Sequence, residues 1–177
     1  MQAVPLIAMW GGTTARHQKS DLMIDPKPEL RLAALDAEDL NVLSAHLQDG
    51  VMRVADMAYL KAQNRFAAVI NRFDWENAEA GSKTAATFSR RRTGLRFERV
   101  KSAQVSNIDL TSKDTILSLL AVQFEMKDNP EGFVTLHFSG GGAIRLHVEC
   151  IEAELRDLGA AWATAKMPAH GQDDPAA

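Results

Sequence analysis

The stretch FVTLHFSGGGAIRLHV, residues 133–148, decides the fold class of this chain. Apolar side chains occupy even-numbered positions on both sides of its glycine run: Val134, Leu136, Phe138, Ile144, Leu146 and Val148. Alternation of this kind is typical of β-strands with one buried face, so the stretch predicts two antiparallel strands. Directly opposed residues of such a pair share a face, and their numbers must therefore sum to an even value. This condition allows a loop of three or five residues, but one of four only with a bulge.

The odd-numbered residues of the same stretch form a predicted polar patch on the opposite face. Its members are Thr135, His137, Arg145 and His147, and Glu149 continues it. Imidazoles and carboxylates are the groups that metal sites and general acid–base catalysts use. Residues two apart on a strand also make an ordinary solvent-exposed face. We therefore expect neither a metal site nor a catalytic centre, and we keep the histidines as an alternative enzymatic face.

The glycine run Gly140, Gly141 and Gly142 could hold an anion through its backbone amides. A strand follows the run, whereas phosphate-binding loops are followed by a helix. Positive φ angles in a tight turn also require glycine without any ligand. The run therefore allows an anion site but does not single it out.

Further strands are predicted on the N-terminal side of the hairpin. VMRVADMAYL (51–60) and RFAAVINRFDW (65–75) are apolar runs that a short polar turn separates, which indicates a second hairpin. GLRFERVKSAQVSNI (94–108) alternates and then slips phase at Arg99, which indicates a bend or bulge between two strands. The segment 116–126 also alternates. Its pattern places the following residues on one face: Ile116, Leu120, Val122, Phe124 and Met126.

One helix is predicted near the N-terminus, after a short strand at residues 30–35. Asp36 can cap it, Leu40, Leu43 and Leu47 share one face, and Gly50 ends it. A second helix is predicted to begin at Glu149. Its apolar stripe has helical spacing: Ile151, Leu155, Leu158 and Trp162.

These elements predict an α+β fold. It is a mostly antiparallel meander sheet, or small bent barrel, of about seven strands, with the C-terminal amphipathic helix packed on the sheet. This architecture resembles the pleckstrin-homology-like superfold, a bent barrel plugged by its last helix. Superfolds host unrelated functions, so the resemblance favours a binding module without naming a ligand.

Composition indicates a single globular domain. The chain has 177 residues, 46% of them hydrophobic, and a net charge of −3. We expect residues 1–28 and 166–177 to be disordered around a domain at 29–165, with a mobile loop at 76–90. Met23 could equally be the start of translation. No apolar run approaches the roughly 20 residues of a membrane span.

The single cysteine, Cys150, excludes an intramolecular disulfide and every multi-cysteine zinc site, so a cytoplasmic setting is expected. Cys150 would lie at a helix N-terminus, where a thiol can become a nucleophile. The neighbouring Glu149 and Glu152 oppose thiolate formation, so we expect a structural role for it.

A basic cluster is the strongest candidate for ligand binding. It contains Arg90, Arg91, Arg92, Arg96, Arg99 and Lys101. Phe88 and Phe97 lie among these residues, and Glu98 is the only acid there. Such a cluster can bind phosphate groups or nucleic acid. It can equally pair with acids near the C-terminus, namely Glu149, Glu152, Glu154 and Asp157.

Four segments resemble an uncharacterised bacterial domain-of-unknown-function family, number 2948. They are DAEDLNVLSAHLQDG (36–50), RFAAVINRFDWE (65–76), RRRTGLRFERV (90–100) and SGGGAIRLHVECIEAELRDLG (139–159). The resemblance implies a cytoplasmic bacterial protein, and it implies no activity or cofactor.

The sequence therefore favours a non-catalytic binding or adaptor module for a protein or an anionic ligand. Two alternatives remain, a small enzyme working at His137 and His147 and an RNA-associated protein using Arg90–Arg92. The near-neutral chain does not favour nucleic acid as a partner.

Overall fold

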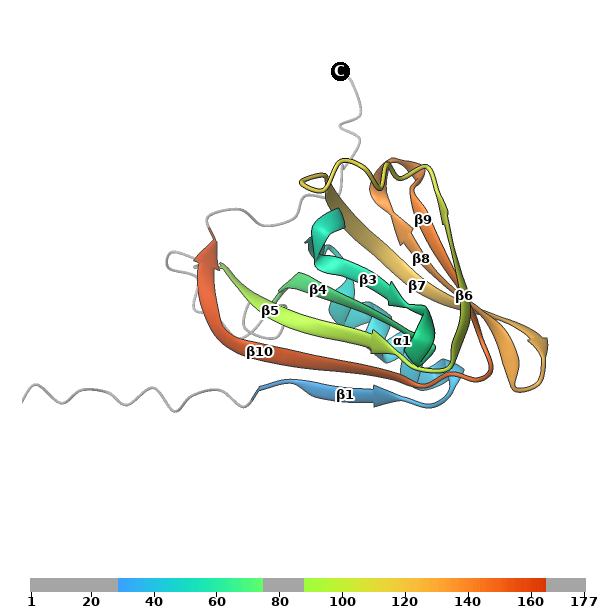
Figure 1. Cartoon of the computed structure of the whole chain (residues 1–177). Helices are drawn as coiled ribbons and strands as arrows, with labels where there is room; N and C mark the ends of the chain where they lie inside the picture. Colours follow the sequence, from blue (N-terminus) through green and yellow to red (C-terminus); the bar gives the residue numbers. More distant parts are fainter. Residues whose placement is uncertain (1–28, 75–87, 165–177) are drawn as a thin grey trace, which may run out of the picture.

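The fold is one curved antiparallel sheet with a helix inside the curve, as a computed structural model shows for residues 29–74 and 88–164 (Figure 1). In chain order the helix and strands are β1 (Arg31–Ala34), α1 (Ala37–Leu47), β2 (Val51–Arg53), β3 (Met57–Leu60), β4 (Arg65–Phe73), β5 (Phe88–Phe97), β6 (Val100–Ser106), β7 (Ile116–Asp128), β8 (Glu131–Phe138), β9 (Ala143–Val148) and β10 (Ala153–Thr164). The strand order is β1-β10-β5-β4-β2-β7-β8-β9-β6, and β3 pairs with β4 beside this path. The sheet that these described strands form does not close into a barrel.

The hairpin of β8 and β9 confirms the prediction from residues 133–148. His137 pairs with Ala143 and Thr135 with Arg145. The Phe138 N–H donates to the Gly142 carbonyl at 2.8 Å, which leaves a three-residue loop. The even-numbered apolar side chains of both strands are buried. Register and burial therefore follow directly from the alternation.

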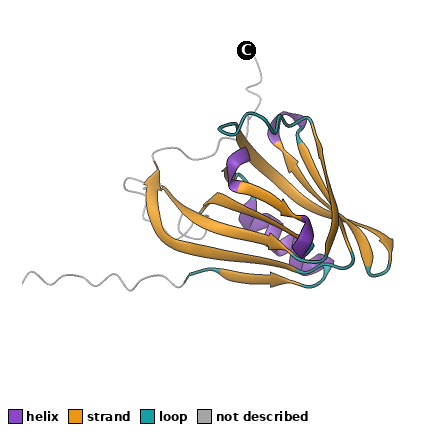
Figure 2. Ribbon diagram, in the orientation of Figure 1, coloured by secondary structure: helices purple, strands orange, loops and turns teal. Residues whose placement is uncertain are grey.

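Helix α1 forms with the predicted cap and buried face, but it ends at Leu47, with Gln48 as its C-cap, and not at Gly50. The Asp36 carboxylate accepts a hydrogen bond from the Asp39 N–H at 2.8 Å and caps the helix. Leu40, Leu43 and Leu47 are buried against the sheet, where α1 packs on β7. Figure 2 shows α1 behind the strands, inside the curve of the sheet. The inner faces of the strands and the leucines of α1 form one core.

The predicted C-terminal helix is wrong, because this segment forms β10 between β1 and β5. Burial alternates along it: Ile151, Ala153, Leu155 and Asp157 are buried, whereas 50% of Leu158 is exposed. The sequence of this segment also fits a helical stripe, because the charged Asp157 interrupts the apolar alternation of the strand. Without a helix, Cys150 does not lie at a helix N-terminus and loses that activation. The side chain of Trp162 lies outside the described residues.

The pattern assigned to residues 116–126 is wrong in its first half. Ile116 and Leu120 are exposed, and the buried residues are Leu117, Leu119 and Val122. The β7–β8 register shifts between Leu119 and Ala121, and this irregularity moves the inward face from odd to even positions.

The strand count and connectivity also differ from the prediction, with ten strands in the described residues and a sheet that is only partly a meander. The second half of the predicted strand 51–60, residues 57–60, pairs with β4 as the hairpin predicts. Its first part, residues 51–53, forms the separate strand β2, which pairs with β4 on one side and with β7 on the other. The bend at Arg99 is confirmed, with a φ of 56° between β5 and β6. The pleckstrin-homology-like architecture is not confirmed, because no C-terminal helix packs on the described sheet. The predicted disordered ends lie outside the described residues, as does the predicted loop up to residue 87, and residues 88–90 belong to β5.

Candidate ligand-binding site

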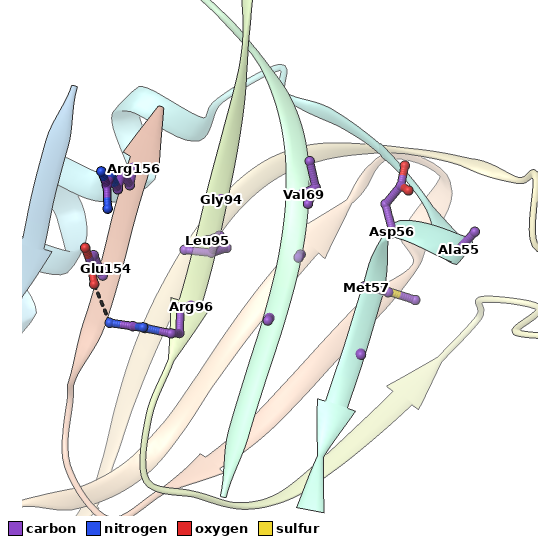
Figure 3. Close-up of a pocket in the computed structure, with 12 residues that line it drawn as sticks. Ala55, Asp56, Met57, Val69, Gly94, Leu95, Arg96, Glu154 and Arg156 are labelled. Atoms are coloured by element: carbon purple, nitrogen blue, oxygen red, sulfur yellow. Dashed lines mark hydrogen bonds and ion pairs between the residues drawn. The ribbon is translucent and has the colours of Figure 1, made fainter. Parts of the chain in front are cut away.

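The outer face of β3, β4, β5 and β10 holds an open pocket of about 490 Å³, here called the outer groove (Figure 3). Its floor consists of small residues that face outward on neighbouring strands: Ala58, Ala67, Val69 and Gly94. Ala58 pairs with Ala67, and Val69 pairs with Gly94, so the four positions form a continuous apolar strip. Side chains this short leave the groove open to a ligand.

Three exposed arginines surround Gly94. Arg92 and Arg96 lie two residues away on either side of it along β5, so they share its outward face. Arg156 lies directly opposite Gly94 on β10. Arg96 and Arg156 line the groove, and Arg92 lies beyond its end. The basic cluster predicted from the sequence includes Arg92 and Arg96 but not Arg156, because Arg156 belongs to the segment for which the sequence predicts a helix.

The three arginines differ in their partners. Arg96 forms ion pairs with Glu154 and with Glu98, the latter at 3.0 Å. The pKa of Asp56 at the groove rim is lowered mainly by its hydrogen bond from Arg53, and the charge of Arg92 adds to this effect. Arg156 forms no ion pair within residues 29–74 and 88–164, so its guanidinium donors are available to a ligand.

Gly94 occupies the middle of a strand that is paired on both sides, a position where glycine weakens a sheet. A Cβ atom built there would lie 3.5 Å from Leu158 Cδ1, an ordinary contact. Leu158 therefore lies beside the glycine and extends the apolar surface of the groove. Glycine at such a position is typical of places where a ligand or another backbone approaches closely.

The remaining members of the basic cluster are dispersed. Arg91 is turned inward, where its Nε lies 3.0 Å from Asp74 Oδ2. Arg90 donates to the carbonyls of Asp49 and Asn71, and burial lowers its pKa. Arg99 pairs with Glu152 at 2.8 Å. Lys101 pairs with Glu131 at 2.7 Å. Alternation along β5 thus separates Arg90–Arg92 into inward and outward groups.

A buried ionic cluster lies on the inner face of the same strands. Asp157 accepts hydrogen bonds from Arg72 at 3.1 and 2.9 Å, from the Thr93 hydroxyl at 2.8 Å and from the Leu30 N–H at 3.0 Å. Burial alone would raise the pKa of Asp157, but these hydrogen bonds outweigh it and lower that pKa. This cluster is not among the sites predicted from the sequence. One feature of the sequence does point to the cluster. The charged Arg72 occupies a position whose side chain faces inward, as the side chains of Phe66, Ala68 and Ile70 do.

The predicted polar patch of Thr135, His137, Arg145, His147 and Glu149 does not form a convergent site. In the β8–β9 register His137 pairs with Ala143 and His147 with Phe133. The two histidines are therefore four ladder positions apart, about 13 Å along the strands. His147 stacks on Phe133 with ring centroids 4.9 Å apart.

Glu131 is the centre of a surface ion-pair network beside this patch. His147 Nε2 lies 2.7 Å from it, and Lys101 and Lys127 pair with it at 2.7 and 3.1 Å. These partners lower the pKa of Glu131 to about 2. We expect a carboxyl ¹³C NMR titration to show its midpoint near 2. The network is then intact above the ordinary glutamate pKa of 4.5 and is lost as the pH falls through about 2. A midpoint near 4.5 would contradict this geometry.

The glycine loop lies in the other half of the sheet from the three arginines. Gly140 and Gly141 have φ values of 78° and 80°, which accounts for glycine at both positions. A Cβ at Gly142 would lie 2.9 Å from Ile108 Cγ1, so close packing accounts for the third. The predicted anion-binding residues thus do not form one site.

Within the described residues, the fold and the groove define an α+β structure with an arginine-rimmed pocket on the outside of a curved antiparallel sheet. The chain belongs to the family described as protein of unknown function (DUF2948), whose sequence model matches residues 30–170. The comparisons with curated proteins and with solved structures found no match. No helix within the described ranges has the length and apolar character needed to cross a membrane.

Proposed function

We propose that the chain is a non-catalytic binding module whose outer groove takes a small ligand with an anionic group and a flat apolar body. The observation that carries this proposal is the position of Arg156, unpaired in the described structure, opposite Gly94 beside an apolar floor. The proposed setting is the bacterial cytoplasm, which the single cysteine and the family resemblance favour.

The chemistry of the groove supports an anion. A guanidinium binds carboxylate or phosphate oxygens through paired, charge-assisted hydrogen bonds. Arg156 can supply these bonds, and Arg96, already fixed by Glu98 and Glu154, contributes positive charge beside it. The apolar part of the ligand would cover Ala67 and Val69 and bury apolar surface.

The groove offers little support for catalysis. Its two carboxylates, Asp56 and Glu154, are both engaged with arginines, at Arg53 and Arg96. The separation of His137 from His147 disfavours the alternative enzyme, and the dispersal of Arg90–Arg92 disfavours the RNA-associated protein. A protein adaptor role is compatible with the position of β6 at one edge of the described sheet.

The proposal is tested by titrating the ¹⁵N-labelled protein with 1-naphthyl phosphate, 1-naphthoate and the neutral 1-naphthol, observed by amide NMR. We expect both anions to shift the resonances of Ala67, Gly94 and Arg156. Naphthol should bind at least about tenfold more weakly, because it lacks charge-assisted hydrogen bonds. Equal affinity for naphthol would contradict an anion site.

The variant Ala67→Phe replaces a methyl group on the groove floor with an aromatic ring that fills part of the groove. It is expected to weaken naphthyl phosphate binding by about tenfold or more. The matched control is Ala143→Phe, an outward-facing position on β9 in the other half of the sheet. Phenylalanine is favourable in strands, so both variants should fold. Equal binding by the two variants would place the ligand elsewhere.

A further inference from the structure

Strands β3 and β6 both present a free edge to the same opening in the sheet. β6 is the last strand of the sheet path, and within the described residues β3 pairs only with β4. The two strands lie close together at the C-terminal end of β3 and move apart toward its N-terminal end (Figure 1). At the narrow end the Tyr59 hydroxyl donates toward the carbonyls of Val100 and Lys101, at 3.2 and 2.9 Å.

A cleft of about 170 Å³, here called the edge cleft, lies between the diverging edges. Its lining reaches the core, because Phe66 and Ile144 belong to both. Val105 pairs with Ile144 and shares its inward face, yet 38% of Val105 is exposed. This inward apolar side chain remains exposed because none of the described strands covers it on the β3 side.

A partner that fills the edge cleft must form hydrogen bonds with backbone groups as well as cover apolar side chains. An unpaired strand edge presents N–H and C=O groups in a row, and an extended chain is the partner that satisfies them. Lys113 is the only charged residue among the described residues that line the cleft. It forms no ion pair with any residue in the ranges 29–74 and 88–164. Lys113 therefore favours a carboxylate on the incoming chain.

We propose that the edge cleft binds an extended peptide segment of another protein by strand addition to β6. The segment carries apolar residues at alternate positions, which cover Val105 and Ala103, and an acidic residue beside Lys113. Backbone hydrogen bonds provide affinity, and the alternate side chains provide specificity. This site is distinct from the pocket proposed for the anionic ligand, although Met57 and Ala58 of β3 line both.

The test is selection of a phage-displayed library of random 12-residue peptides on the full chain. We expect enriched peptides with alternating apolar residues and one acid. Their synthetic versions should slow amide hydrogen exchange at Ala103–Val105. Binding should fall by at least about tenfold in Val105→Lys, since an edge lysine opposes strand addition. Lys113→Glu should weaken the binding of acidic peptides, and it should leave unchanged the binding of peptides in which lysine replaces the acidic residue.

The matched control is Met126→Lys, an exposed apolar residue on β7 away from the cleft, which should leave binding unchanged. Circular dichroism confirms that each variant folds. Failure to enrich peptides above an unrelated protein target would overturn the proposal, as would equal binding by Val105→Lys. Analytical ultracentrifugation gives a further outcome that would overturn the proposal, namely a dimeric wild type and a monomeric Val105→Lys. The occupant of the cleft would then be a second copy of this chain.

Discussion

Replacing Asp157 by alanine is expected to lower the free energy of unfolding by about 3–5 kcal/mol, because it leaves the Arg72 guanidinium buried without its carboxylate. Both side chains are almost fully enclosed, with relative exposures of 2% and 1% for Arg72 and Asp157. Thr93 and the Leu30 N–H lose their acceptor in the same variant. Urea unfolding at pH 7 measures the loss, and a loss below about 1 kcal/mol would contradict the buried pair.

A double variant separates the cost of an unpaired charge from the value of the pair. Arg72→Met combined with Asp157→Leu removes both charges and should recover at least half of the lost stability. The pH dependence gives a second control. The pKa of Asp157 lies below its ordinary 3.8, so its contribution is complete above about pH 4 and is lost as the pH falls through the lowered pKa. The difference between wild type and Asp157→Ala should therefore shrink in acid.

Replacing Leu155 by alanine is expected to lower the free energy of unfolding by about 2–5 kcal/mol, as truncation of a fully buried leucine does. The matched variant Leu158→Ala should lower it by less than about 1 kcal/mol, since Leu158 is half exposed beside Gly94. Denaturant titration compares the two. Strand β10 predicts this asymmetry, whereas an amphipathic helix would bury both leucines and give similar losses.

The same two leucines show where sequence reasoning succeeds and where it fails. The β8–β9 hairpin could be predicted down to a choice between a three-residue and a five-residue loop, because six apolar residues alternate without an interruption. In β10 the inward position 157 carries a charge, which is neutralised by residues far away in the sequence: Arg72, 85 residues away, and Arg91, whose guanidinium lies 3.9 Å from the Asp157 carboxylate. In the sequence, a buried ion pair between remote strands shows only as a charge at an inward position, as at Arg72, and nothing there identifies its partner. The remaining apolar residues of the β10 segment fit a helical stripe equally well.

The candidate site was predictable only in part for the same reason. Arg92 and Arg96 were found as part of a basic run, but strand alternation sends Arg91 to the inner face. Arg156 joins them through the β5–β10 pairing, which could not be derived while its segment was assigned to a helix. The proposed anion-binding surface therefore depends on the register between strands that are far apart in the sequence.

The affinity of 1-naphthyl phosphate for Arg156→Gln, compared with Arg99→Gln, tests most directly whether the outer groove binds an anion. Arg99 is an exposed arginine beside a different surface and pairs with Glu152, so its loss controls for net charge. The account predicts that Arg156→Gln binds at least about tenfold more weakly than wild type and that Arg99→Gln binds within about twofold of it. Equal affinities for the two variants would contradict the account.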